Sequence, residues 1–404
     1  MKFPKQAKLL PAVFLVLMPF MQGCGDFWQA PSGGSGSGSG TSTSLSSGIF
    51  YVINQTAKLI VAYQINSGSL NTIGAYTLNS APSAITIAPG NGFLYVSTVT
   101  GIYLYTINSG GSLTAGNNGD AISSDVAAAM AVDTTGTWLV DAETVTGGVT
   151  LNAISITSTG TLNSTTEQTQ TFTVANASVD QMALSGDDAN IFLALGEGGT
   201  LIDPFTSTNP NPLGGHASTI ATTTTGASAL SVAVDPGSTA TAPRLFYIGE
   251  TEAVSSSGGL RAFDYSSLSS GTATEISGSP YASGGLAPTA ILPDPTGAYV
   301  FVASGQGATS DGILQGFNIA SNTANSTTTY SLSSISSIAT GIQPAGLAED
   351  SNENFVFAVS SGGSDDLDIY LFDTTTLGKL DASNLSTSTG TDPTGAIAVA
   401  AQTP

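Results

Sequence analysis

Acidic side chains are the residues of this chain that are best placed to do chemistry. Glu143, Glu197, Glu250 and Glu252 end short apolar runs or open the loops that follow them. A hydrolase needs a general base and a group that stabilises an oxyanion. Glu197 or Glu250 as the base, with Arg261 as the stabiliser, would satisfy this requirement. An ordinary alternative stays open, in which Glu197 belongs to a glycine-rich turn and Arg261 pairs with a neighbouring acid.

A second group of acids suggests a metal site. Asp365, Asp366 and Asp368 lie in the segment GGSDDLD, and Asp311 follows an earlier apolar run. Carboxylate oxygens are hard ligands that suit Ca²⁺. Asp365 and Asp366 are therefore the candidate ligands, and Ca²⁺ is the one cofactor that we consider. The spacing matches no recognised calcium loop, so an acidic rim exposed to solvent is the alternative.

These residues must be positioned by a repeated unit that occurs seven times. Each copy has a small apolar run, a turn, an aromatic-rich run, a Gly/Ser/Thr loop and a further apolar run. A period of about 50 residues with several strands per unit is typical of a β-propeller. The aromatic-rich runs are IFYVIN at 49–54, FLYVST at 93–98, TWLVDA at 137–142, IFLALG at 191–196, LFYIGE at 245–250, YVFVAS at 299–304 and FVFAVS at 355–360.

The sequence therefore predicts an all-β fold, a seven-bladed propeller with four-stranded antiparallel blades over residues 49–404. We name the strands of a blade A to D from the axis outward, so that the aromatic-rich runs are B strands. The predicted A strands are 83–89, 128–134, 180–186, 230–236, 289–295, 345–351 and 395–401. The predicted C strands are 60–66, 102–108, 152–157, 201–207, 260–266, 314–320 and 369–375.

The order of these segments predicts how the ring closes. The folded part begins with a B strand at Ile49 and ends with an A strand at Ala401. The last A strand must therefore complete the first blade, which removes the exposed edges of an open ring. Aspartates recur in the A–B turns, where an Asp side chain caps its own turn. They are Asp133, Asp187, Asp235, Asp294 and Asp350.

Net charge limits the partners. The chain of 404 residues has a formal charge of −21, and three of its seven basic residues lie in the N-terminal 23. Such an acidic chain repels phosphate backbones, which argues against nucleic acid as a partner. We expect the face that carries the B–C loops to be acidic and free of lysine, and to attract cations.

The N-terminus resembles an export signal with a lipid anchor. Residues 1–23 place three lysines before a short apolar stretch, which is too short for a comfortable bilayer span. Cys24, the only cysteine, follows Met21-Gln22-Gly23, a sequence that resembles a bacterial lipobox and implies lipidation. Residues 24–48 then form a tether rich in Gly and Ser. A plain secretory signal with an incidental cysteine is the alternative.

The repeats resemble YVTN-type propellers and the seven-bladed lactonase family of 6-phosphogluconolactonase-like proteins. The resemblance rests on Tyr51-Val52-Ile53-Asn54, on Tyr95-Val96-Ser97-Thr98, and on PSAITIAPGNGFLYVSTVTGIYLYTIN at 82–108, with matching phrases at 288–319 and 344–373. It implies the propeller fold and His, Arg and Glu side chains at the mouth of the ring. His216, the only histidine, and Arg261 are the candidates, because Arg244 opens a B strand on the opposite face.

The sequence predicts a cell-envelope lipoprotein, exported and lipid-anchored, at the outer membrane or cell surface rather than the inner membrane. Its propeller would be a monomeric binding or interaction module for a small molecule, glycan or protein. The scarcity of basic residues and histidine favours a binder over an enzyme. The alternative function is a lactonase-type hydrolase acting on a sugar lactone.

Overall fold

The aromatic-rich strand segments are short and buried on both faces. The computed structural model describes residues 48–238, 244–324, 327–389 and 395–402. In β1 (Ile49–Asn54) and β5 (Phe93–Thr98) every residue after the first is buried. Successive side chains of a strand point to opposite faces. Continuous burial therefore means that both faces of each sheet are covered.

Three sheets have four antiparallel strands each. The first has the order β28 (Ala396–Ala401), β1, β2 (Leu59–Asn66), β3 (Ser69–Thr77). The second has the order β4 (Pro82–Ile87), β5, β6 (Gly101–Ile107), β7 (Leu113–Ala115). The third has the order β8 (Ala129–Val132), β9 (Trp138–Val145), β10 (Gly148–Ile156), β11 (Leu162–Thr173). A short 3₁₀ helix, η1 (Asn117–Gly119), lies between the second and third sheets in the chain.

The remaining strands form two larger sheets. A nine-stranded sheet contains β12 (Ala177–Leu184), β13 (Asn190–Gly196), β14 (Thr200–Pro204), β15 (Ser218–Ile220), β16 (Ala229–Val234), β17 (Leu245–Val254), β18 (Ser257–Asp264), β19 (Thr274–Glu275) and β20 (Tyr281–Ala282). One residue pair, Gly196 with Ala229, joins its β12–β15 part to its β16–β20 part. A second 3₁₀ helix, η2 (Tyr265–Ser270), follows β18.

A seven-stranded sheet contains β21 (Ala287–Pro293), β22 (Tyr299–Gly305), β23 (Asp311–Ala324), β24 (Thr327–Glu349), β25 (Phe355–Gly362), β26 (Leu367–Phe372) and β27 (Leu380–Ala382). The long strand β24 pairs with β23 along its first part and with β25 along its last part. It therefore belongs to two consecutive four-stranded groups. The prediction of an all-β fold is confirmed, and several of its sheets are four-stranded and antiparallel as predicted.

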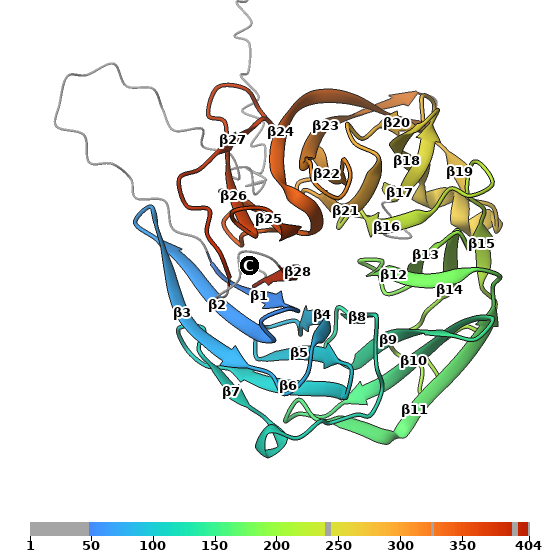
Figure 1. Ribbon diagram of the computed structural model, residues 1–404. Coiled ribbons are helices and arrows are strands. Elements are labelled where there is room, and N and C mark those ends of the chain that lie inside the picture. The colour runs from blue at the N-terminus through green and yellow to red at the C-terminus, as the bar shows by residue number, and fades with distance from the viewer. Residues whose placement is uncertain (1–47, 239–243, 325–326, 390–394, 403–404) are drawn as a thin grey trace, which may run out of the picture. The chain divides into compact units, whose positions relative to one another are not determined.

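The sheets follow one another around a central space (Figure 1). Strands β28, β4, β8, β12, β16 and β21 lie on the inner side, whereas β3, β7 and β11 lie on the outside. β28 pairs with β1, with Val399 opposite Val52, so the C-terminal strand belongs to the same sheet as the first. The predicted pairing of these two segments is confirmed.

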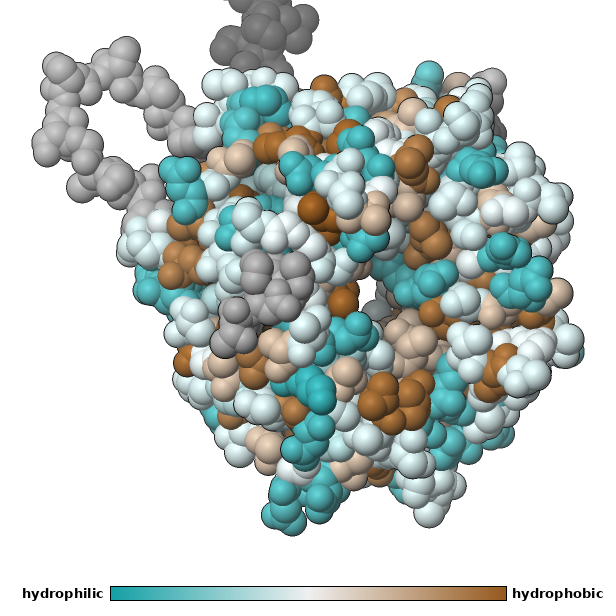
Figure 2. Space-filling model, in the orientation of Figure 1, coloured by the Kyte–Doolittle hydropathy of each residue, from teal (hydrophilic) through white to brown (hydrophobic). Residues whose placement is uncertain are grey.

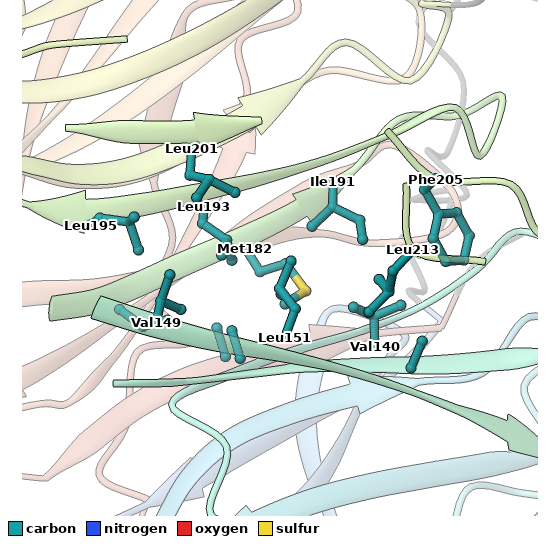
Figure 3. Close-up of a cluster of buried hydrophobic side chains, with 14 of the residues drawn as sticks. Val140, Val149, Leu151, Met182, Ile191, Leu193, Leu195, Leu201, Phe205 and Leu213 are labelled. Carbon is teal, nitrogen blue, oxygen red and sulfur yellow. The ribbon is translucent and has the colours of Figure 1, made fainter. Parts of the chain in front are cut away.

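The core consists of apolar layers between consecutive sheets. Figure 3 shows one such layer, in which Val149 and Leu151 of β10 face Ile191 and Leu193 of β13, with Met182 of β12 among them. All these side chains are at most 9% exposed. Because each sheet is apolar on both faces, neighbouring sheets exclude water from one another.

The first and last sheets make a layer of the same kind. The rings of Phe50 in β1 and Phe357 in β25 are stacked, with their centroids 4.0 Å apart. Ala396 of β28, Val52 and Val359 complete this cluster. Segments about 300 residues apart in the chain are thus packed as tightly as neighbours.

The predicted role of aspartates in the A–B turns is confirmed where hydrogen bonds define it. Asp133 Oδ1 accepts from the backbone N–H groups of Thr137 and Trp138, each at 2.7 Å. Asp350 Oδ1 accepts from Asn354 N–H at 2.7 Å. Asp294 accepts from Thr296 N–H at 3.1 Å. These buried carboxylates satisfy turn amides that the strands leave unpaired.

The predicted signal at 1–23, Cys24, and residues 24–47 of the predicted tether lie outside the described residues. The described part of the chain contains no helix with the length and hydrophobicity of a bilayer span.

Candidate functional site

A cavity of about 480 Å³ opens among the innermost strands of four consecutive strand groups. Its walls come from β12, β16, β21 and β24, from the end of β22 and the turn after it, and from the end of β25. Small residues such as Ala287, Gly305 and Ala345 line much of it, because several strands converge there and leave little room for side chains. Figure 2 shows an opening at the centre of the face in view, with polar and apolar residues mixed around it.

Asp180 is the one ionisable side chain that lines this cavity among the described residues. The Asp180 residue is exposed to solvent, yet the protein around its carboxylate removes part of the hydration. This desolvation raises the pKa of Asp180 to about 6. The carboxylate is therefore negative at neutral pH and titrates close to it.

Neutral polar groups complete the wall. The hydroxyl of Thr289 donates to the carbonyl of Pro344, which fixes β21 against β24. Ser361 Oγ donates to Gln343 Oε1 at 3.2 Å. Leu286, an exposed apolar residue, also lines the cavity. The arrangement offers one negative charge, an amide and hydroxyls beside apolar surface, and no lysine, arginine or histidine lines it among the described residues.

Asp180 was missed by reasoning from the sequence, although a signal was present. The seven predicted A strands start with small or apolar residues except for the run DQMALSG at 180–186. A charged residue at the start of an innermost strand breaks the repeat. Such a departure places a carboxylate where the other copies present uncharged side chains.

Glu250 and Arg261, the predicted base and stabiliser, do come together. Arg261 Nη1 donates to Glu250 Oε2 at 2.9 Å, and Arg261 Nε donates to Glu275 Oε1 at 3.1 Å. Glu250 is 0% exposed and Arg261 is 7% exposed. The pair lies outside the residues that line the cavity. The geometry matches the alternative in which Arg261 pairs with neighbouring acids.

Other residues of the protein also form hydrogen bonds with Glu250 and Arg261. Glu250 Oε1 accepts from the backbone N–H and the hydroxyl of Thr223, and Arg261 Nη1 also donates to the carbonyl of Ala221 at 2.9 Å. The sequence predicted a strand over 260–266, with Arg261 near its start. The observed strand β18 begins at Ser257, so Arg261 lies in its middle. The ion pair thus ties the segment before β16 to β17 and β18.

Glu197 and His216 do not join this pair. Glu197 is exposed in the β13–β14 turn, where Asn176 Nδ2 donates to its Oε2 at 3.2 Å. His216 is exposed in the segment between β14 and β15. Near this segment, burial raises the pKa of Asp203, although the backbone amides of Gly214 and Gly215 oppose part of the rise. The four candidate catalytic residues therefore form no single constellation in the described chain.

Asp366, a candidate metal ligand, has its carboxylate engaged in hydrogen bonds. It accepts from Asn54 Nδ2 at 3.0 Å, from Thr389 N–H at 2.6 Å and from the Thr389 hydroxyl at 2.7 Å, and it is 0% exposed. Asp365 next to it is partly exposed. In the ranges that the structure describes, no group of three or more His, Cys, Asp or Glu side chains is arranged to hold a metal ion.

The face that carries the B–C turns contains acids that influence one another. Burial raises the pKa of Asp368, and the charges of Asp365 and Asp311 raise it further.

The expectation that this face has no lysine was wrong. Lys58 is exposed in the turn between β1 and β2, with a φ of 54°.

Glu349, at the end of β24, is a further buried acid that the sequence reasoning did not single out. Both of its carboxylate oxygens are buried and have no hydrogen-bond partner among the described residues. Burial raises its pKa to about 9, with Asp294, Glu353 and Asp350 adding to the shift. The Glu349 carboxyl group is therefore protonated at neutral pH.

No family model and no curated protein sequence matches this chain. Several solved structures are similar to this chain in fold. A candidate 6-phosphogluconolactonase from Bacteroides fragilis has a TM-score of 0.62 at 17% identity, covering 90% of this chain and 99% of its own. The periplasmic gluconolactonase of Pseudomonas aeruginosa has a TM-score of 0.62 at 15% identity, covering 87% and 98%. A protein from Lactobacillus plantarum has a TM-score of 0.60 at 15% identity, covering 88% and 99%.

At such identities the similarity establishes the fold alone, because one fold hosts many unrelated functions. The chain has a lactonase-like β-propeller fold. The resemblance to YVTN-type repeats stays a prediction.

Proposed function

We propose that this protein is an extracytoplasmic binding module whose central cavity takes a small neutral or cationic ligand. The observation that carries the proposal is the composition of the cavity wall. One carboxylate, Asp180, lies there beside amide, hydroxyl and apolar groups, without a basic residue among the described lining. Ligand sites combine apolar surface with a few convergent polar groups in this way.

The net charge of the protein also favours a neutral or cationic ligand over an anionic one. An anionic ligand would meet the Asp180 carboxylate and the field of a chain with a net charge of −21. A phosphorylated sugar would find no counter-charge in the described wall. An amine or a neutral polyol, by contrast, can donate hydrogen bonds to the carboxylate.

The proposal includes a closed ring of seven blades. It is supported by contacts between innermost strands in the order β28, β4, β8, β12, β16, β21, β24 and back to β28. It is also supported by the antiparallel pairing of β28 with β1. A closed ring would hold the strands that form the cavity at constant spacing, since each blade supports its neighbours on both sides.

The cellular context is proposed from the sequence. An export signal at 1–23 and a lipid on Cys24 would place the propeller outside the cytoplasm, attached to the membrane through its tether. In that position the propeller would meet ligands of the cell envelope or its surroundings.

Lactone hydrolysis is the second candidate. It is favoured by the fold shared with proteins described as gluconolactonases and by a carboxylate whose pKa is about 6 in the cavity. A general base works best when its pKa is near the operating pH. Asp180, rather than the buried Glu250, would then be the base.

A thermal-shift screen combined with a hydrolysis assay separates these functions. The probes are putrescine, glucono-1,5-lactone and 6-phosphogluconolactone, each with the original protein and Asp180→Asn. The binding proposal expects stabilisation by putrescine or the neutral lactone that Asp180→Asn weakens, and no effect of the phosphorylated lactone. If none of the probes binds, or if only the phosphorylated one does, the proposal is wrong. Lactone hydrolysis that rises through pH 6 and disappears in Asp180→Asn would establish the second candidate instead.

A further inference from the structure

A second cavity lies between the first two sheets, away from the central one. Its volume is about 280 Å³, and it is enclosed by the end of β3, the segment after it, and β6 and β7. Figure 1 shows these strands side by side on the outer part of the molecule. Three tyrosines line it, Tyr76, Tyr103 and Tyr105, together with Thr98 and Asn79.

The tyrosine rings are fixed by the strands that carry them. Tyr103 and Tyr105 are two residues apart in β6, so their side chains share one face of the sheet. Tyr76 comes from β3 of the adjacent sheet, and its hydroxyl accepts from Leu113 N–H of β7 at 2.8 Å. This bond joins the two sheets across the cavity and holds the Tyr76 ring in place.

Hydroxyl groups at the cavity retain hydrogen-bonding capacity. A tyrosine hydroxyl can donate one hydrogen bond and also accept. The Tyr76 hydroxyl accepts from Leu113, and its proton has no acceptor among the described residues. The Tyr103 hydroxyl shares one hydrogen bond with Thr100 Oγ1 at 3.0 Å. Asn79, which is exposed, adds an amide with both donor and acceptor groups.

No charged side chain lines this cavity in the described chain. Rigid aromatic faces, hydroxyls and an amide, without ionic groups, match a sugar ring. A pyranose has an apolar C–H face and a polar hydroxyl edge, and tyrosine offers an apolar body with a polar tip. The volume lies just below the range of about 300–1,000 Å³ for larger ligands, which suits a single ring.

We propose that the cavity between β3 and β6–β7 binds one pyranose unit of a neutral glycan. This site is separate from the central cavity and does not depend on the function proposed for it. It would let the propeller contact envelope polysaccharide at its side while the central cavity takes its own ligand.

Saturation-transfer NMR and calorimetry on the full-length protein test this site. The probes are methyl α-glucopyranoside, methyl β-galactopyranoside and methyl N-acetyl-β-glucosaminide, with glucuronate as the charged comparison. At least one neutral glycoside should bind more tightly than glucuronate. Tyr103→Ala should weaken that binding by about tenfold, because it removes a ring of the wall, and Tyr103→Phe by a smaller factor.

Tyr281→Phe is the matched control, because Tyr281 is a partly exposed tyrosine of β20 whose hydroxyl donates to Ser277 O at 2.8 Å and which does not line this cavity. It should leave binding unchanged, as should Asp180→Asn. The proposal is overturned if no glycoside of the panel binds, or if binding survives Tyr103→Ala. It is also overturned if Asp180→Asn abolishes binding, which would move the sugar to the central cavity. If Tyr103→Ala does not fold, an unchanged affinity in both Tyr103→Phe and Asn79→Ala overturns it.

Discussion

Arg261 Nη1 donates a hydrogen bond to Glu250 Oε2 across 2.9 Å, and both side chains are buried. The two residues most suggestive of catalysis in the sequence are therefore partners in an internal ion pair. Breaking a buried pair leaves an uncompensated charge, whereas replacing both partners by apolar residues is much less costly.

Glu250→Gln should lower the free energy of unfolding by about 3 kcal/mol, because Arg261 then loses a buried counter-charge. The double variant Glu250→Leu/Arg261→Met should be more stable than the sum of the single changes predicts. Urea unfolding measures both. Lys379→Met is the control, since Lys379 pairs with Asp373 and Asp381 at the surface, where solvent screens the charges, and its loss should cost far less stability than that of Glu250. A stable Glu250→Gln variant that lost lactone hydrolysis would instead assign Glu250 to catalysis.

Glu349 should make the fold more stable in mild acid than in base. Its pKa is about 9 in the folded protein against an ordinary value of 4.5, so the folded state holds a proton that the unfolded state releases. Between these two values, stability falls as pH rises. Melting temperatures from pH 5.5 to 9 should decline. Glu349→Gln should stabilise the protein at pH 7.5 by about 1–4 kcal/mol and flatten the decline. An unchanged slope in Glu349→Gln would contradict this account.

Asp366→Asn should destabilise the fold whether or not Ca²⁺ is present. An amide in this place would set its NH₂ group against donors from Asn54 and Thr389, at a cost of about 1–3 kcal/mol. Asp365→Asn, at a partly exposed position, should cost much less. Melting curves with Ca²⁺ and with a chelator give the comparison. A Ca²⁺-dependent stabilisation that both variants lose, and that resists salt, would show a metal site here.

Truncation before β28 should unfold the protein or lower its melting temperature sharply. Removal of residues 395–404 deprives β1 of one of its two pairing partners, since β2 alone remains, and exposes Phe50 and Val52. A chain ending at Gln402 is the control and should match the original. Circular dichroism and protease resistance report the outcome. A stable, protease-resistant truncation would contradict the structural role of β28.

Cys24→Ala should release the exported protein from the membrane fraction. The expectation rests on the apolar stretch that ends in Gly23-Cys24. Fractionation of cells that produce either form measures it, and labelling with a palmitate analogue checks for the lipid directly. Sedimentation of the variant with membranes would place the anchor elsewhere.

The strands and their order were predictable because their signals are local. Aromatic and β-branched runs such as IFYVIN at 49–54 mark strands by composition, and Asp133 marks a turn by its own hydrogen bonds. The pairing of β28 with β1 also followed from the sequence, since a final A-type run has no other blade to complete. The outer strands were less predictable, because β15, β19 and β20 are two or three residues long.

The sequence by itself determined the all-β class, the repeated unit and the segments that become strands. Only the tertiary structure decided which chemical groups meet. It buries Arg261 between Glu250 and Glu275 and places Asp180 in the wall of the central cavity. It also leaves the Glu349 carboxyl group without a hydrogen-bond partner among the described residues. The physical reason is that strand formation depends on neighbours in the chain. The burial of a side chain, its hydrogen-bond partners and its pKa depend instead on which distant sheet covers it. These contacts form only when the sheets pack against one another.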